Sequence, residues 1–176
     1  MAKNAKTQMI FSGLGANLAS PAFGPPVRTL EAALARLDGG DCRVVRRSSW
    51  YETAPLPASD QPWFVNGVAE LATALPPARL LARLHEVEGA LGRVRSVPNA
   101  PRVVDLDLLV YGEEVLDEAP GPIVPHPRLH ERAFVLLPLR ELAPDWIDPR
   151  TGRSIDELIR ALPPGQVCRP LNRDGA

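Results

Sequence analysis

The stretch VVDLDLLVY, residues 103–111, predicts a β-strand whose two faces differ in chemistry. It is rich in β-branched and apolar residues, which strands favour. Side chains alternate along a strand, so Asp105 and Asp107 share one face with Cβ atoms about 7 Å apart. Leu106 and Leu108 point to the other face. We therefore expect this strand to cover the core with one face and to present two carboxylates with the other.

The hydrophobic periodicity on both sides of this strand predicts the order strand, helix, strand, strand, helix, strand, followed by helical segments. The predicted strands are 9–14, 43–51, 64–75 and 103–111, and the predicted helices are 27–37, 76–91, 134–142 and 154–162. This order is that of the ferredoxin-like, split β-α-β arrangement. The sequence thus predicts an α+β fold in which helices cover one face of an antiparallel sheet.

Length and composition favour a single domain and argue against several classes of protein. The 176 residues fit one domain, with residues 1–8 and about 165–176 loosely ordered. The balance of 20 basic and 21 acidic side chains argues against a general nucleic-acid binder. No apolar run is long enough to span a membrane, and the first residues lack the apolar part of a signal peptide. Cys42 and Cys168 match no metal-ligand spacing; they form either a disulfide or two isolated thiols, and the second interpretation favours a cytoplasmic protein. We also expect a monomer.

The two aspartates allow two interpretations. Like charges on a partly covered face repel each other, and Mg²⁺ relieves this because it binds a few carboxylates together with phosphate oxygens. Alternatively, Asp105 and Asp107 belong to a half-exposed strand whose polar face lies in water. The spacing by itself leaves both interpretations open.

Nearby arginines favour the first interpretation. Arg93 and Arg95 follow the second predicted helix, Arg102 directly precedes the acidic strand, and Arg132 lies further along the chain. A guanidinium stays charged and binds phosphate oxygens through two donors, so arginines beside a metal site suit a polyphosphate. Arginines are also common on protein surfaces, but three within ten residues next to paired carboxylates indicate a magnesium–polyphosphate site.

Other segments are less informative by themselves. Residues 13–17, GLGAN, lack the lysine of a phosphate-binding loop and the third glycine of a dinucleotide fingerprint, so we assign them no phosphate-binding role. They predict either a tight turn that closes the first strand or a functional role. His85 and Glu88 are neighbours on a helix, either at a solvated edge or with Glu88 buried against a partner. Phe64 and Phe134 are typical of core aromatics. The residues alone do not identify what accepts the phosphoryl group.

Several segments together resemble one family, the 6-hydroxymethyl-7,8-dihydropterin pyrophosphokinases of folate biosynthesis. The resemblance runs from Gly13 to about Trp146. The matching segments are GLGANL (13–18), SSWYETAPL (48–56), DQPWFVN (60–66), Glu88 with GRVR (92–95), PRVVDLDLL (101–109), VPHP (124–127) and RAFVLLPL (132–139). Each segment alone is weak, but their occurrence in this order is specific.

The resemblance implies an activity and a set of roles. The hydroxymethyl oxygen of the pterin would attack the β-phosphorus of ATP, and AMP would leave. Asp105 and Asp107 would bind two Mg²⁺ ions on the triphosphate, and with Arg93 and Arg102 they would form the catalytic set. The pterin would contact Phe64, Phe134, Asn66 and the backbone around Thr53, Ala54 and Leu56. The nucleotide would contact His85, Glu88, Arg93, Arg95, Arg102, Leu108, His126 and Arg132.

The chain departs from the family pattern in four places. Residues 96–100 replace a segment that often carries Arg-Trp-Gly in the family, and they are about one residue shorter. Ala16, Phe64 and His85 stand where the family often has Ser, Tyr and Gln. The first two of these replacements keep the backbone role and the stacking surface, whereas the third changes a nucleotide contact.

Two rival hypotheses come from other classes of protein. A ferredoxin-like module without activity could bind a nucleotide or a protein partner, because one fold hosts many functions. A nucleotide-sugar transferase could also carry an Asp-x-Asp motif, but the chain is short for one and lacks a recognisable nucleotide-binding α/β half.

Overall fold

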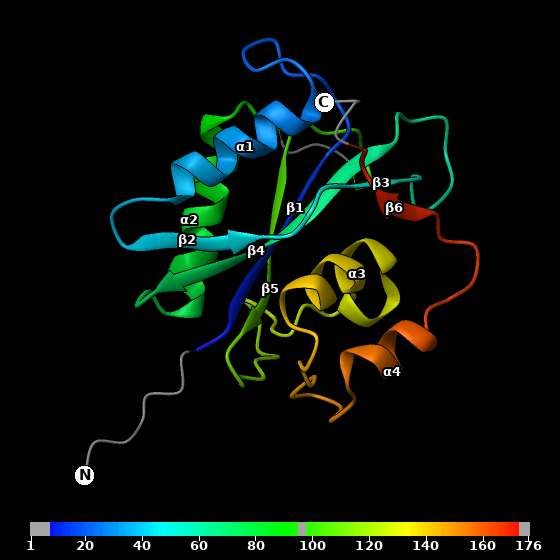
Figure 1. Ribbon diagram of the computed structural model, residues 1–176. Coiled ribbons are helices and arrows are strands. Elements are labelled where there is room, and N and C mark those ends of the chain that lie inside the picture. Colours follow the sequence, from blue (N-terminus) through cyan, green and yellow to red (C-terminus); the bar gives the residue numbers. More distant parts are fainter. Residues whose placement is uncertain (1–7, 95–97, 173–176) are drawn as a thin grey trace.

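The computed structural model describes residues 8–94 and 98–172, which form one antiparallel sheet with helices on both faces (Figure 1). The strands are β1 (Ile10–Ala16), β2 (Cys42–Arg47), β3 (Tyr51–Thr53), β4 (Phe64–Thr73), β5 (Asp105–Tyr111) and β6 (Cys168–Pro170). The helices are α1 (Pro26–Leu37), α2 (Pro77–Ala90), α3 (Ala133–Leu142), α4 (Ile155–Arg160) and the short 3-10 helix η1 (Leu129–Glu131). The sheet order is β5-β1-β4-β3-β6, and β2 also pairs with β4. The predicted α+β class and antiparallel sheet are confirmed.

Helices α1 and α2 cover one face of the sheet. Both begin at a proline, whose fixed φ and missing N–H suit the first turn of a helix. Leu30 and Leu84 are fully buried there, in one apolar cluster with Leu106 of β5. Helix α2 continues through Gly89 to Ala90, so its apolar stripe outweighs the helix-weakening glycine.

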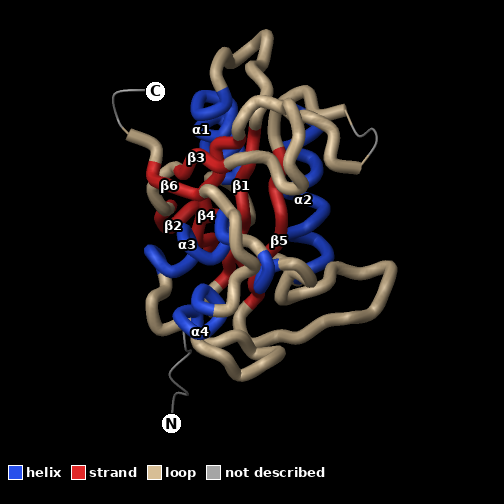
Figure 2. The backbone as a smooth tube through the Cα atoms, turned by 90° about the vertical axis from the view of Figure 1, so that its right-hand side faces the viewer, coloured by secondary structure: helices blue, strands red, loops and turns tan. Residues whose placement is uncertain are grey.

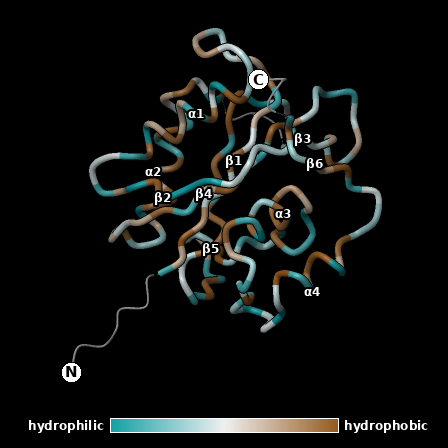
Figure 3. Tube along the Cα trace, viewed as in Figure 1, coloured by the Kyte–Doolittle hydropathy of each residue, from teal (hydrophilic) through white to brown (hydrophobic). Residues whose placement is uncertain are grey.

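Helices α3 and α4 pack on the opposite face, so the expectation that helices cover only one face is wrong. Figure 2 shows the strands between the two groups of helices. The reason is a second apolar set that lies on this face at one end of the sheet, including Phe11, Val68 and Leu109. These side chains need cover from water, and Leu136 and Leu139 of α3 provide it. Figure 3 accordingly shows hydrophobic residues both along β1 and in α3.

The predicted strand 43–51 is two strands in the structure. Strand β2 pairs with the far part of β4, up to Ala69, and β3 pairs with its beginning, from Phe64 to Asn66. Ser48 lies in the break and keeps the two parts connected to β4: its N–H donates to the carbonyl of Val68, and its Oγ accepts from the N–H of Val68. Composition did not reveal this break because both parts are rich in strand-forming residues.

Within residues 166–172, the chain forms a sixth strand that the sequence analysis did not predict. Strand β6 pairs with β3, and the N–H of Leu171 donates to the carbonyl of Trp50 at 2.8 Å. The backbone groups at the edge of β3 need partners, and β6 supplies them. A strand of three residues is too short for its periodicity to predict it. In the described part of the chain, no helix combines the length and the hydropathy that crossing a bilayer requires.

Candidate active site

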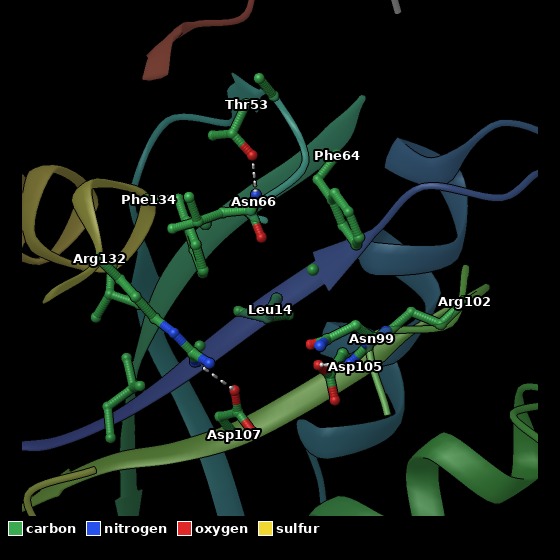
Figure 4. A pocket seen from close by; sticks show the side chains of 17 residues that line it. Leu14, Thr53, Phe64, Asn66, Asn99, Arg102, Asp105, Asp107, Arg132 and Phe134 are labelled. Carbon is green, nitrogen blue, oxygen red and sulfur yellow. Dashed lines mark hydrogen bonds and ion pairs between the residues drawn. The ribbon is translucent and has the colours of Figure 1, made fainter. Parts of the chain in front are cut away.

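A cavity lies on the face of the sheet that α3 covers only in part (Figure 4). Its walls come from β1, β4 and β5, from the end of β3, and from the start of α3. The predicted site residues that line it are Thr53, Ala54, Leu56, Phe64, Asn66, Arg102, Asp105, Asp107, Arg132 and Phe134. The structure therefore brings the pterin set and the carboxylate set into one space.

Two glycines of β1 form part of the cavity floor. Gly13 pairs with Asp107 and Gly15 pairs with Asp105 on the neighbouring strand. A Cβ at Gly15 would lie 2.6 Å from Oδ1 of Asn66, which is closer than real Cβ contacts allow. The predicted tight turn at these glycines is wrong: they lie inside β1, where the absence of side chains leaves room between Asp105 and Asn66.

The two carboxylates lie on the same face of β5, as the strand periodicity predicted. Both line the cavity, and their side chains are 24% and 38% exposed for Asp105 and Asp107, respectively. Asp105 forms ion pairs with Arg93 and, at 2.6 Å, with Arg102. Asp107 has a longer contact, 4.0 Å, with Arg132. The pair thus has one strongly neutralised member and one member that faces the cavity with less compensation.

The electrostatics of Asp107 reflect this difference. Burial, followed by repulsion from Asp105, raises the pKa of Asp107 to about 6, although Arg132 opposes the rise. A raised pKa means that the charged form is disfavoured in this environment. A bound cation would reverse this preference, so Asp107 is suited to a metal ion.

The donor set fits magnesium rather than a metal that is held by protein alone. Among the described residues, no group of three or more His, Cys, Asp or Glu side chains could enclose an ion. Mg²⁺ binds through one or two carboxylates and takes its other ligands from water and substrate phosphates. Asp105 and Asp107 match this pattern. Arg93 and Arg102, which form ion pairs with Asp105, are also of the residue type that binds phosphate well.

The other end of the cavity is a flat apolar slot with an amide in it. Phe64 and Phe134 lie on either side of Asn66 in Figure 4. The amide Nδ2 of Asn66 donates to Oγ1 of Thr53 at 2.6 Å, which fixes its orientation. Asn66 is only 7% exposed, so little of its amide is in contact with bulk water. This arrangement suits a planar heterocycle with hydrogen-bonding groups on its edge.

Glu88 and Arg93 support the carboxylates from behind. Glu88 is 2% exposed, and its Oε1 accepts from the N–H of Leu106 at 2.7 Å and from Arg93 at 2.8 Å. Helix α2 therefore fixes both the acidic strand and the arginine that binds Asp105. Of the two interpretations of Glu88, the buried and partnered one is correct.

Of the remaining predicted nucleotide contacts, Leu108, His85 and His126 do not line the cavity. The side chain of Leu108 is buried on the α1 and α2 face, and His85 is exposed on α2. His126 is partly buried, and burial together with Arg132 lowers its pKa to about 4, so it is neutral at neutral pH. Arg95 and residues 96–97 of the altered segment lie outside the described residues. The roles of these residues toward a nucleotide stay predictions.

A polar network at the mouth of the cavity was missed by sequence reasoning. Asn17 donates to Oε1 of Gln61 at 3.1 Å and accepts from the N–H of Arg102 at 2.9 Å. Gln61 donates in turn to the carbonyl of Asn99 at 2.8 Å, and Asn99 lines the cavity with a left-handed φ of 59°. Asparagine tolerates this conformation better than most residues. The choice of asparagine at position 99 was the only local indication of this network, because the residues it connects are far apart in the sequence.

The chain is similar in sequence to known proteins of one family. Residues 11–144 match the family described as 7,8-dihydro-6-hydroxymethylpterin-pyrophosphokinase. A 2-amino-4-hydroxy-6-hydroxymethyldihydropteridine pyrophosphokinase of Pseudomonas aeruginosa is 44% identical over 157 residues, which cover 89% of this chain and 93% of that protein. The enzyme of the same name from Synechocystis is 42% identical over 151 residues, covering 85% of this chain and 74% of that protein.

A solved structure supports the fold independently. The crystal structure of Plasmodium falciparum HPPK-DHPS superposes with a TM-score of 0.65 at 14% sequence identity. The match covers 89% of this chain but only 43% of the other, so this chain spans less than half of that protein. The family match over most of the chain and the close relatives decide the matter: the chain belongs to the 7,8-dihydro-6-hydroxymethylpterin-pyrophosphokinase family.

Proposed function

We propose that the chain transfers pyrophosphate from ATP to 6-hydroxymethyl-7,8-dihydropterin in this cavity, with Asp105 and Asp107 binding Mg²⁺ and with AMP as the second product. The proposal rests on one observation: a single cavity contains two different groups of residues. One group is the aromatic slot with its oriented amide, and the other is the carboxylate–arginine cluster. Neither half alone would specify both substrates.

The slot binds the pterin. Phe64 and Phe134 stack on the two faces of the ring, and Asn66 binds its polar edge because Thr53 already holds the amide in one orientation. Stacking and a buried hydrogen bond together select a flat, amide-like ring over an aliphatic alcohol.

The charged end binds the triphosphate. Arg102 and Arg132 line the cavity, and Arg93 lies directly behind Asp105. Guanidinium groups in a partly buried site stabilise the negative charge that moves between phosphate oxygens during transfer. When bound, Mg²⁺ would be held by Asp105 and Asp107 and would offset the negative charge of the phosphates.

The chemical step is an in-line displacement. The hydroxymethyl oxygen forms a bond to the β-phosphorus and releases its proton to water. The bond from that phosphorus to the oxygen shared with the α-phosphate breaks, and AMP leaves with the electron pair. The residues contribute by position: the slot orients the alcohol and the arginines orient the phosphates. Such positioning accounts for much of catalysis in phosphoryl transfer.

The rival of a silent binding module is not favoured, because the relatives are named as pyrophosphokinases and the full carboxylate–arginine set is present. A cytoplasmic location and a monomeric state stay predictions.

An isotope experiment tests the proposal. The purified chain is incubated with ATP labelled at the β-phosphorus, Mg²⁺ and 6-hydroxymethyl-7,8-dihydropterin, and the products are separated. We expect the β-label to move to the pterin, with one AMP released per pterin consumed. A pterin that carries a methyl group in place of the hydroxymethyl, and a sample with excess EDTA, serve as controls. Release of ADP instead of AMP, or equal AMP release without the pterin, would contradict the proposal.

A further inference from the structure

The segment of residues 166–168 lies directly behind two walls of the pterin slot. It encloses a small gap together with Thr53, Ala54, Leu56 and Phe134, all of which also line the main cavity. No motif marked this segment in the sequence, and in the structure it connects the start of α3 with the end of β3.

The side chain of Gln166 caps helix α3. Its Oε1 accepts from the N–H of Ala133 at 2.9 Å, and its Nε2 donates to the carbonyl of Glu131 at 2.8 Å. The first N–H groups of a helix have no partner within the helix. Arg132, at the N-cap position, provides no side-chain hydrogen bond to them, so Gln166 does this from the far end of the sequence.

The capped residue stands between two site residues. Ala133 is flanked by Arg132, which contacts Asp107, and by Phe134, which forms one face of the slot. The guanidinium carbon of Arg132 also lies 5.4 Å from the centre of the Phe134 ring. The placement of both side chains therefore depends on the backbone that Gln166 holds.

The next two residues hold the facing wall. The carbonyl of Val167 accepts from the N–H of Ala54 at 3.2 Å, and Cys168 pairs with Thr53 in the sheet. Thr53 in turn accepts the hydrogen bond that orients Asn66. One short segment thus connects the Phe134 wall to the Thr53–Ala54 wall.

We infer that Gln166 is a positioning residue for the pterin: by capping α3 it sets the distance of Phe134 from the Thr53–Ala54 wall. This inference rests on the proposed function of the slot. Of the arginines assigned to the triphosphate, Arg132 depends on this segment, whereas Arg93 and Arg102 are held by contacts that do not involve it. The effect should therefore fall on the pterin more than on ATP.

The test compares two variants, each of which lacks the cap of a different helix. Gln166→Ala removes the cap of α3, and Ser154→Ala removes the cap of α4, where the Ser154 side chain accepts from the N–H of Glu157. We expect Gln166→Ala to raise the KM for the pterin about fivefold, which corresponds to one lost cap, and to change the KM for ATP less than about twofold. Gln166→Glu keeps an acceptor for Ala133 and should give a smaller rise. Ser154→Ala should lower Tm to a similar degree without changing either KM.

Hydrogen exchange gives a readout that does not depend on turnover. Gln166→Ala should accelerate amide exchange in residues 131–136, and Ser154→Ala should not. An inactive wild-type chain would refute the proposed function, and the exchange data would still test the cap. The inference is overturned if Gln166→Ala leaves exchange in this segment unchanged, if its pterin KM equals that of the wild type, or if Gln166→Glu is as impaired as Gln166→Ala.

Discussion

The two faces of β5 come from one heptapeptide and have opposite properties. On the face toward α1 and α2, Leu106 and Leu108 are 1% and 4% exposed. On the other face, the side chains of Asp105 and Asp107 are 24% and 38% exposed and line the cavity. Helices α1 and α2 close the first face, whereas α3 packs against the apolar part of the second face and leaves the aspartates open. The candidate active site therefore lies at the one end of this sheet face that α3 leaves uncovered.

Asp107→Ala should separate activity from stability on this strand. We expect kcat/KM to fall about 10²- to 10³-fold, because a charge that acts on the transferring group is lost, while the circular dichroism spectrum stays that of the wild type. The matched control is Asp145→Ala, an exposed acid in the loop after α3. Turnover of Asp107→Ala at the wild-type rate would remove the carboxylates from the mechanism.

Leu106→Ala, one position away, should give the reverse result. Removing a fully buried leucine leaves a cavity under α2, and we expect a loss of about 3 kcal/mol in the free energy of unfolding. Urea unfolding followed by fluorescence measures this, with Val45→Ala, 46% exposed, as the control. Activity per folded molecule should remain. A loss below about 1 kcal/mol would show that the α1 and α2 face is less tightly packed than its burial indicates.

Gly15→Ala tests the floor between the two halves of the cavity. The new methyl group would push the Asn66 amide away from its place beside Thr53. We expect the KM for the pterin to rise about tenfold, the cost of a disturbed buried hydrogen bond. Gly89→Ala in α2, where a Cβ would meet nothing within 4 Å, is the control and should leave the KM unchanged. An unchanged pterin KM in Gly15→Ala would mean that Asn66 does not bind the ring.

The smallest effect concerns the charge of Asp107 in metal-free buffer. Its pKa rises from 3.8 to about 6 on folding, so the folded state binds more protons than the unfolded state between these values. The free energy of unfolding should therefore fall as pH rises through this window. Water screens the partly exposed group, so we expect only about 1 kcal/mol, and Asp107→Asn should raise Tm at pH 7.5 by about 2–4 °C. Calorimetry at pH 4.5 and 7.5 measures this, and Asp145→Asn should not reproduce the pH dependence.

The sequence by itself determined the alternating faces of β5, the start of α2 at a proline, and, through ordered motifs, the family. These features are local, because a hydrophobic period of two residues (strand) or 3.6 residues (helix) is recognised from the segment itself, without the rest of the chain. The same reasoning correctly placed Asp105 and Asp107 on one side of a strand.

Only the tertiary structure decided which elements cover which face. Helix α3 on the second face, Gly15 beside Asn66, Glu88 behind Arg93, and Gln166 at the start of α3 all join residues that are far apart in the sequence. Periodicity states that a face is apolar or polar, but it does not identify the element that packs there. A backbone N–H that needs a partner at Ala133 likewise gives no local indication that residue 166 will provide it.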